Sequence, residues 1–547
     1  MMRTRMRTRF TSFVLACALL SAVGFAQAEH HGSSEKLGTV NFKTSCDSAT
    51  QPQFNRAVAL MHSFQFASAI EAFHAILESD PACSMAYWGI ALSDWGNPFA
   101  TGLKSQTQLD AGLKTVEQGR RLPAKTERER AYLEAVAHLY TDSATTDQRS
   151  RKLAYESAMA AVSAAYPEDT EAAIFYALAV SAAADPADKT YARQLKAGAI
   201  LDRLYVQYPD HPGLAHYIIH TYDVPPLAAR AAGAAQHYSE IAPSTPHALH
   251  MPSHTFTRVG DWQASIDANV ASVAAARSAG QPADELHASD YLEYAYLQTA
   301  QDNASKGVVE SADQIFSRFD PKMLIGGAGG ATAAYFARAA IPARYDLERR
   351  DWASAVKLQP LASPFPYTEA MTYFARGLGA AHLKAGVGAR AAIDSLAQCR
   401  DRLNTMKEGF WANQVEIQRL EVVAWLASSQ GQTEDALAGM RRAAEMEDAT
   451  EKSVVTPGPL APARELLAEL LLESKRPAEA LLEFEATLKR EPNRFWSLYG
   501  AAEAAKGIGD QERAKKYFNE LVRVAERADR PGRRELIEAR GSLSGQD

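Results

Sequence analysis

Histidine is the residue type whose spacing most suggests chemistry in this sequence. Eight of the fourteen histidines fall within residues 211–287. Two pairs there have members four residues apart, His216 with His220 and His250 with His254, and each member of the second pair follows its counterpart at the same interval. Side chains four apart share one face of a helix, and this interval, about 34 residues, is a period of helix–turn–helix repeats. Two successive repeats would therefore present four imidazoles on one face.

Other polar residues extend this pattern along the same repeats. One histidine lies three residues before His250, and an aspartate lies three residues after His220. The next repeat has a His, Asp and Tyr with the same three-then-four spacing. Together with the four paired histidines, the candidate site therefore comprises Asp223, His247, Arg258, His287, Asp290 and Tyr294.

One interpretation of this patch is a metal site with His216, His220, His250 and His254 as ligands. Four residues of helix rise about 6 Å, and neighbouring helices pack about 8–10 Å apart, so imidazoles of two helices can reach one ion. Zinc and copper suit imidazole ligands. A nearby aspartate would orient a ligand or act as an extra one; the candidates are Asp223 and Asp290.

The same residues also fit two other interpretations. The histidines would line a concave groove for a protein, peptide or small ligand, with Arg258 attracting an anion, or they would satisfy each other and buried backbone groups. Pro252 bears on all three, because proline is tolerated only in the first turn of a helix. If a helix begins there, His250 precedes it, and the face that it would share with His254 is less defined.

Helical hairpins are the elements that must position these side chains. In the first repeat, Ala69 and Phe73 would fill the space between two helices, and the same pair recurs as Ala480 with Phe484. A further pair follows after one more interval of the same length, at Ala514 and Phe518. These anchors resemble the tetratricopeptide repeat (TPR) over most of residues 50–525. The resemblance implies an all-α, tetratricopeptide-type superhelix, which is an α-solenoid.

The layout also resembles a group of exported bacterial TPR proteins in which two histidine segments recur. In this chain they read HYIIH, at residues 216–220, and HALHMPSH, at residues 247–254. The resemblance implies the architecture and leaves the chemistry open, because repeat folds serve many functions.

The chain is too long for one compact core, since it has 547 residues, of which 47% are hydrophobic. We expect it to divide into successive segments along one solenoid. These are a signal peptide (1–28), an N-terminal segment with the first repeat (29–100), a divergent helical region (101–190), histidine-rich repeats (191–310), a linker with a divergent repeat (311–365), C-terminal repeats (366–527) and a polar tail (528–547).

The N-terminal residues 1–28 have the pattern of a secretory signal, with four arginines, an apolar stretch and a small-residue cleavage site ending at Ala28. Cleavage would remove those four positive charges and change the formal net charge from −7 to −11. No later run has the length of a membrane span. These features predict a periplasmic or secreted protein that neither spans a membrane nor, being acidic, binds nucleic acid.

Three cysteines remain after cleavage, and we expect Cys46 and Cys83 to form a disulfide in an oxidising compartment, leaving Cys399 as a buried thiol. The sequence has no nucleophile-elbow, zinc-protease or nucleotide-loop motif, so we assign no catalytic residue. The function expected first is therefore binding or scaffolding through a histidine-lined groove. A zinc- or copper-binding protein, or a metal-dependent enzyme, is the alternative.

Overall fold

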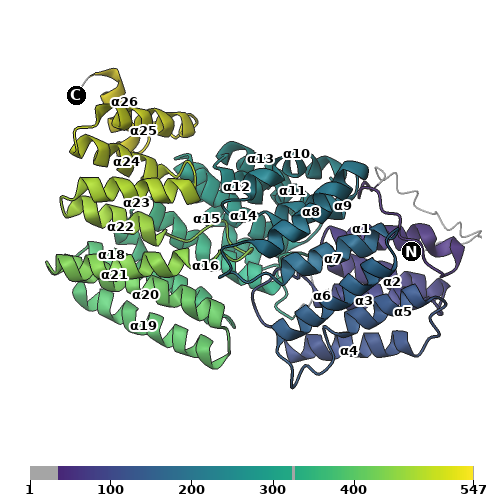
Figure 1. Ribbon diagram of the computed structural model, residues 1–547. Coiled ribbons are helices and arrows are strands. Elements are labelled where there is room, and N and C mark those ends of the chain that lie inside the picture. The colour runs from purple at the N-terminus through teal and green to yellow at the C-terminus, as the bar shows by residue number, and fades with distance from the viewer. Residues whose placement is uncertain (1–34, 323–326, 546–547) are drawn as a thin grey trace, which may run out of the picture. The chain divides into compact units, whose positions relative to one another are not determined.

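The computed structural model describes residues 35–322 and 327–545. Contacts divide the chain into Met1–Glu35 and a compact unit, Lys36–Asp547, and the fold of that unit follows here. Its described residues form helices and no β-strand (Figure 1), which confirms the all-α class. Residues 1–28, interpreted above as an export signal, lie outside the described residues. Within the described chain, none of the helices combines the length and the apolarity that a membrane span requires.

Helices that follow one another in the chain pack on each other through most of the unit, and several also contact the next helix but one, as α1 does α3 and α18 does α20. This is the contact pattern of a tetratricopeptide-type solenoid. The first helices are η1 (Ser48–Thr50), α1 (Gln51–His62), α2 (Phe66–Ser79), α3 (Ser84–Trp95), α4 (Gln106–Arg120), α5 (Glu127–Ala137), α6 (Gln148–Ala165), α7 (Thr170–Ala182) and α8 (Ala192–Gln207).

The histidine-rich repeats occupy the middle of the unit, drawn in teal in Figure 1. Their helices are α9 (Pro212–Thr221), η2 (Ala228–Ala231), α10 (Ala232–Ile241), α11 (Pro246–His250), α12 (Pro252–Val259), α13 (Trp262–Ser278), α14 (Pro282–Gln298) and α15 (Asp302–Phe316). Besides packing on its neighbours in sequence, α9 contacts α1 and α7.

The C-terminal repeats, green to yellow in Figure 1, complete the solenoid. They comprise α18 (Pro366–His382), α19 (Gly386–Thr405), α20 (Gly409–Ser429), α21 (Thr433–Asp448), α22 (Ala463–Glu473), α23 (Pro477–Arg490), α24 (Phe495–Gly507) and α25 (Gln511–Val524). Helices α16 (Gly330–Glu348) and α17 (Trp352–Ala355) precede them, and α26 (Arg534–Ser544) follows in the segment expected to be a polar tail.

A phenylalanine packed against a glycine of the next helix holds helices together in the first repeat and in one of the C-terminal repeats. The ring of Phe73 in α2 lies so close to Gly89 in α3 that a Cβ there would be 2.3 Å from it. Phe484 and Gly500 repeat this arrangement between α23 and α24, at 2.2 Å. Both phenylalanines are fully buried. The anchors that suggested the repeat thus do the same packing at both ends.

The turn after the second histidine pair joins the middle of the chain to its C-terminal repeats. Gly260 ends α12 with a φ of 72°, which glycine adopts without strain. Asp261 then caps α13 by accepting a hydrogen bond from the Ala264 amide. The Asn493 side chain donates to the Gly260 carbonyl (3.0 Å), and the Trp262 indole donates to the Asn493 carbonyl (2.8 Å). Repeats that lie far apart in the sequence are therefore in direct contact here.

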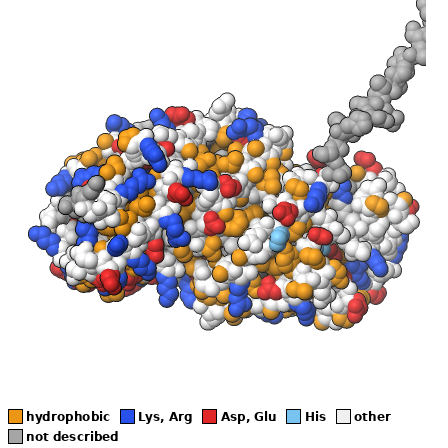
Figure 2. Space-filling model, turned by 90° about the horizontal axis from the view of Figure 1, so that it is seen from above, with side chains coloured by type: hydrophobic (Ala, Val, Ile, Leu, Met, Phe, Trp, Pro, Cys, Tyr) orange, Lys and Arg blue, Asp and Glu red, His pale blue; other side chains and the backbone are white. Residues whose placement is uncertain are grey.

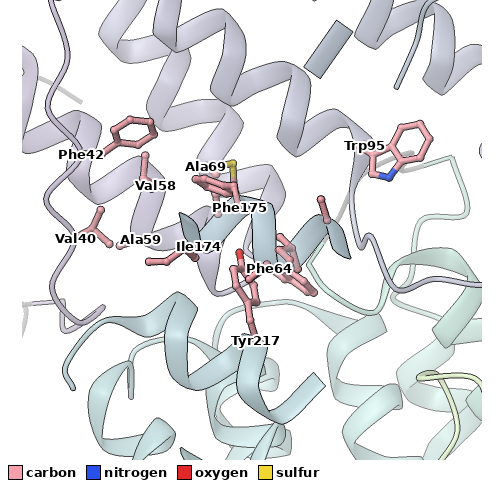
Figure 3. Close-up of a cluster of buried hydrophobic side chains, with 14 of the residues drawn as sticks. Val40, Phe42, Val58, Ala59, Phe64, Ala69, Trp95, Ile174, Phe175 and Tyr217 are labelled. Atoms are coloured by element: carbon pink, nitrogen blue, oxygen red, sulfur yellow. The ribbon is translucent and has the colours of Figure 1, made fainter. Parts of the chain in front are cut away.

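Two large hydrophobic clusters form most of the core, one from the N-terminal part and the histidine repeats and one from the C-terminal repeats. Figure 3 shows part of the first, where Phe64, Phe175 and Tyr217 meet. The expected disulfide is confirmed, since Cys46 and Cys83 are bonded with their Cα atoms 4.9 Å apart. Cys399 is a buried free thiol, also as expected.

Candidate metal centre

Helix α9 carries the first histidine pair toward α1. The Nδ1 atom of His216 lies 2.6 Å from the backbone carbonyl oxygen of His62, the last residue of α1. Gly213 permits this approach, because a Cβ at that position would be 2.4 Å from the His62 ring. His220 lies one turn further on and is buried, yet neither of its ring nitrogens has a hydrogen-bond partner among the described residues. Its ring stacks on Phe99, with centroids 4.4 Å apart.

His247 of α11 joins this pair to form a first triad. One ring nitrogen from each of His216, His220 and His247 lies within 4.8 Å of the other two. The Nε2 atoms of His216 and His247 are 3.2 Å apart. Phe64, in the turn between α1 and α2, packs its ring against all three, with centroids 4.3 to 5.6 Å away. The neighbouring contact of Phe64 with Tyr217 is visible in Figure 3.

His250, His254 and His287 form a second triad, whose ring nitrogens also lie within 4.8 Å of one another. A helix does begin at Pro252, and His250 precedes it as the last residue of α11. The shared face is nevertheless kept, because Met251 between the two helices has helical dihedral angles. The two triads are neighbours, with the ring centroids of His220 and His254 5.5 Å apart.

The hydrogen bonds of the second triad leave two lone pairs facing each other. His250 Nδ1 is 2.7 Å from Asn269 Oδ1, and His254 Nδ1 is 2.9 Å from Asp223 Oδ2. The amide nitrogen of Asn269 donates to the Ser265 carbonyl, so the atom that faces His250 is the amide oxygen, which can only accept. Each ring must therefore carry its proton on Nδ1. The two Nε2 atoms, 3.1 Å apart, then have no proton to share while both rings are neutral.

In the first triad, the ring of His216 is held in the same way. The carbonyl of His62 can only accept, so His216 also carries its proton on Nδ1 and turns the Nε2 lone pair toward His247. Histidines that bind metals usually donate their second ring nitrogen to a carboxylate, a carbonyl or another acceptor, which fixes the coordinating nitrogen. His216, His250 and His254 all have such an acceptor.

Burial keeps these imidazoles neutral, as metal binding requires. It lowers the pKa of His216 to about 3, and, with the charges of His254 and Lys452, it lowers the pKa of His287 to about 3. Burial also lowers the pKa values of His220, His247 and His250 well below 6.5, and the charges of neighbouring histidines lower them further. On the face drawn in Figure 2, histidine contributes almost nothing to the surface.

Asp223 is the carboxylate that is hydrogen-bonded to the histidine cluster, and three cationic or proton-donating groups surround it. Besides His254, it accepts from Arg258 Nε at 2.8 Å and from Lys452 Nζ at 2.9 Å. Burial alone would raise the pKa of Asp223, but the charges of Lys452 and Arg258 and the hydrogen bond from His254 hold it well below its usual range. Arg258 is thus already paired with a carboxylate.

Asp290 and Tyr294 point away from the cluster, although they share α14 with His287. Asp290 is paired with buried Arg344, and Tyr294 bonds to Arg494 and Glu491. The residue of α14 that reaches the histidines is Tyr291, one turn after His287. Its hydroxyl lies 3.3 Å from His254 Nδ1. Asp223, His247 and His287 do join the four paired histidines, and all ten sequence-predicted residues are no more than 8% exposed.

A loop from the C-terminal repeats, residues 449–462 between α21 and α22, covers the histidine cluster beside Asp223 and Tyr291. Lys452 of this loop reaches Asp223, and the Tyr291 hydroxyl donates to the carbonyls of Val454 and Thr456. Three prolines and a glycine mark residues 449–462 as a loop, but no local pattern reveals what the loop contacts, because Tyr291 and Val454 are 163 residues apart.

A pocket of about 330 Å³ connects solvent with the edge of the cluster. His220 and Asp223 are among its lining residues, as are Glu451, Lys452 and Val454 of the loop. His220 is therefore the member of the first triad that lines this pocket, although both of its ring nitrogens are buried.

Another polar cluster lies nearby and escaped the sequence analysis. Glu171 of α7 accepts from His62 Nε2 and His211 Nε2, both at 2.9 Å, and His62 Nδ1 is 2.9 Å from the Tyr217 hydroxyl. Each of these contacts pairs a donor with an acceptor and forms without an ion, whereas Nδ1 of His211 is buried and has no partner among the described residues. Its link to the centre is the His62 carbonyl that holds His216.

Comparisons with known proteins give no family. No family model and no curated protein matches the chain. Among solved structures, similar chains include the human IFIT1 dimer with m7Gppp-AAAA, at 11% identity and a TM-score of 0.39, covering 88% of this chain and 96% of that one. A monomeric IFIT1 mutant with Gppp-AAAA, at 10% identity, has a TM-score of 0.36 over the same shares of the two chains. Likeness of this degree assigns neither ligand nor activity.

Proposed function

We propose that this chain is a helical-repeat protein that binds transition-metal ions, zinc or copper, in its six clustered histidines. The observation that carries the proposal is the contact between His250 Nε2 and His254 Nε2, 3.1 Å apart, in rings whose protons are held on the opposite nitrogen. Two lone pairs at that distance repel each other unless a cation lies between them. In a tetrahedral zinc site, ligand nitrogens are about 3.3 Å apart, close to this separation.

The donor set favours zinc or copper over calcium or magnesium. Each triad offers three neutral imidazoles and no carboxylate, and hard cations require oxygen ligands. Two triads side by side would hold one ion each. Three protein ligands leave a coordination position free, which is the pattern of catalytic rather than structural zinc.

The rival explanation is a proton in place of the ion. If His254 were an imidazolium, it could donate to Asp223 and to His250 at once, and the second triad would be a hydrogen-bonded core element. The negative charge of Asp223 favours that form, whereas burial, the largest influence, lowers the pKa of His254. A proton on His254 would still leave His220 without a partner, whereas an ion in the first triad would bind one of its ring nitrogens.

Ligand binding without a metal, expected first from the sequence, is the second candidate. The pocket of about 330 Å³ beside His220 supports it and favours a small ligand over a peptide or protein. For localisation, the disulfide supports export to an oxidising compartment, periplasmic or extracellular. We also propose that the chain belongs to the group of exported bacterial TPR proteins that its histidine segments resemble.

Metal content of protein purified without a histidine tag, dialysed against zinc or copper and then against buffer, tests the proposal. We expect about two retained equivalents in wild type, one for each triad. His250→Ala should retain fewer, whereas the matched control His237→Ala should equal wild type, because His237 is 62% exposed and lies outside both triads. Retention of neither metal by folded wild type would refute the metal site and leave the proton explanation.

A further inference from the structure

Four buried side chains that line the pocket beside the first triad have polar atoms without a hydrogen-bond partner among the described residues. They are His220, with both ring nitrogens, Thr221, with its hydroxyl, Gln194, with its amide oxygen, and Glu451, with Oε2. Each is no more than 9% exposed. Buried polar groups are nearly always hydrogen-bonded, so four that line one pocket indicate a ligand that supplies missing partners.

The charges of the pocket define which ligand this is. Both of its carboxylates already face cations. Asp223 accepts from Arg258 and Lys452, Glu451 Oε1 accepts from Lys189 and the Tyr191 hydroxyl, and Glu451 Oε2 lies 4.0 Å from Arg258 and 3.8 Å from Arg490.

Lys152 differs, because its Nζ donates only to the Pro98 carbonyl, at 3.0 Å, and no carboxylate of the described residues lies within ion-pair distance. Burial, together with the charge of Arg149, lowers the pKa of Lys152 to about 8, as expected for a cation without a counter-ion. The pocket thus offers positive charge without a partner, and Phe99 and Phe410 add aromatic walls.

We propose that this pocket admits a small organic anion whose donor atom binds directly to the ion held by His216, His220 and His247. The inference rests on the proposed metal function. Three imidazoles leave that ion a free coordination position, and His220 is the ligand that lines the pocket. The anion displaces a water molecule from the ion, Lys152 balances its charge, and its apolar part lies between the phenylalanines. This would make the first triad the reactive site and the second, covered by Tyr291 and the loop, a closed one.

Azide and benzoate are the probes for this proposal. Protein loaded with copper(II) or cobalt(II), with its metal content measured first, is titrated with each anion while the visible absorption and magnetic resonance spectra are recorded. We expect both anions to change the spectrum of about half of the bound metal, since only one of two triads is open.

Two variants test whether the anion reaches the ion through this pocket. Ala184→Trp places a large side chain in the pocket at a half-buried position of its wall, and it should abolish the benzoate response with the metal content unchanged. Lys152→Gln should weaken azide binding about fivefold, as expected for the loss of one partly screened charge. The matched control, Lys515→Gln, changes an exposed lysine of α25 outside the pocket and should bind both anions as wild type does.

The outcomes separate the two proposals. Loaded protein whose spectra respond to neither anion would overturn the inference and leave the metal function intact. A response that Ala184→Trp and Lys152→Gln leave unchanged would overturn it too, because the anion would then reach the ion by another path. Protein that binds no metal would refute the proposed function itself.

Discussion

The Nε2 atoms of His250 and His254 lie 3.1 Å apart, although Asn269 and Asp223 hold the protons of both rings on Nδ1. An ion bound between these two atoms, as proposed, would need both residues. His216 belongs to the other triad, where its Nε2 faces His247. Double variants can therefore count the ions.

The first prediction concerns additivity within and between triads. His250→Ala combined with His254→Ala should lose little more metal than either single variant, because the first substitution already disrupts their shared site. His250→Ala combined with His216→Ala should lose the metal of both triads, so the two losses add. Calorimetric titration with zinc and copper measures both. Loss of all metal in His216→Ala alone would show that one ion serves all six histidines.

The second prediction concerns the counter-ion of the centre. Asp223→Asn keeps the shape of the side chain but leaves buried Lys452 and Arg258 without their carboxylate. We expect a loss of about 3 kcal/mol in the free energy of unfolding. We also expect metal affinity to fall about 10- to 100-fold, because His254 loses the carboxylate that orients it.

Urea unfolding and metal titration measure the two effects of Asp223→Asn. The matched control is Asp267→Asn, at an exposed aspartate of α13. If the two variants behaved alike, Asp223 would have no special role.

The sequence predicted the helical repeats and the histidine pairs because both depend on local spacing. Ala69 with Phe73 and Ala480 with Phe484 mark hairpins by themselves, and His216 and His220 share a face wherever a helix forms. Spacing alone could not decide which face of α14 meets the cluster. Tyr291 rather than Asp290 reaches it, since Arg344, 54 residues later, pairs with Asp290.

The remaining parts of the centre depend on contacts between distant segments. Lys452 lies 229 residues after Asp223 in the chain, and no period of the sequence relates the loop at residues 449–462 to α14. In the sequence His62 is only a lone histidine of an amphipathic helix, yet its backbone carbonyl fixes the His216 ring. Backbone groups of this kind leave no signal in the identity of a side chain.

The third prediction concerns the disulfide between Cys46 and Cys83, which are 37 residues apart. Replacing both with serine should lower the free energy of unfolding by about 3–4 kcal/mol, because the unfolded chain regains the entropy of the open loop. Thiol titration of denatured, unreduced wild type should find a single thiol, that of Cys399. Three reactive thiols would show that the bond does not form in the protein as produced.

The fourth prediction concerns Asp284, at the start of α14, where burial raises the pKa of its carboxyl to about 6. The folded state then binds the proton more tightly than the unfolded state, so this group destabilises the fold increasingly as pH rises from about 4 to 6 and by a constant amount above that range.

Asp284→Asn should remove this effect and keep the hydrogen bond from the Gly329 amide. It should match wild type near pH 4 and be more stable by up to about 3 kcal/mol at pH 7.5. Urea unfolding at both pH values measures this. A difference independent of pH would contradict the shifted pKa, and Asp267→Asn again provides the exposed control.

The measurement that tests the metal centre most directly is anomalous X-ray diffraction from crystals of the zinc- or copper-loaded protein, recorded on both sides of the metal absorption edge. The account predicts a peak within about 2.0–2.1 Å of ring nitrogens in each triad, one beside His250 and His254 and the other beside His216, His220 and His247. Loaded crystals with no peak at either triad, or with metal only at surface histidines such as His237, would contradict it.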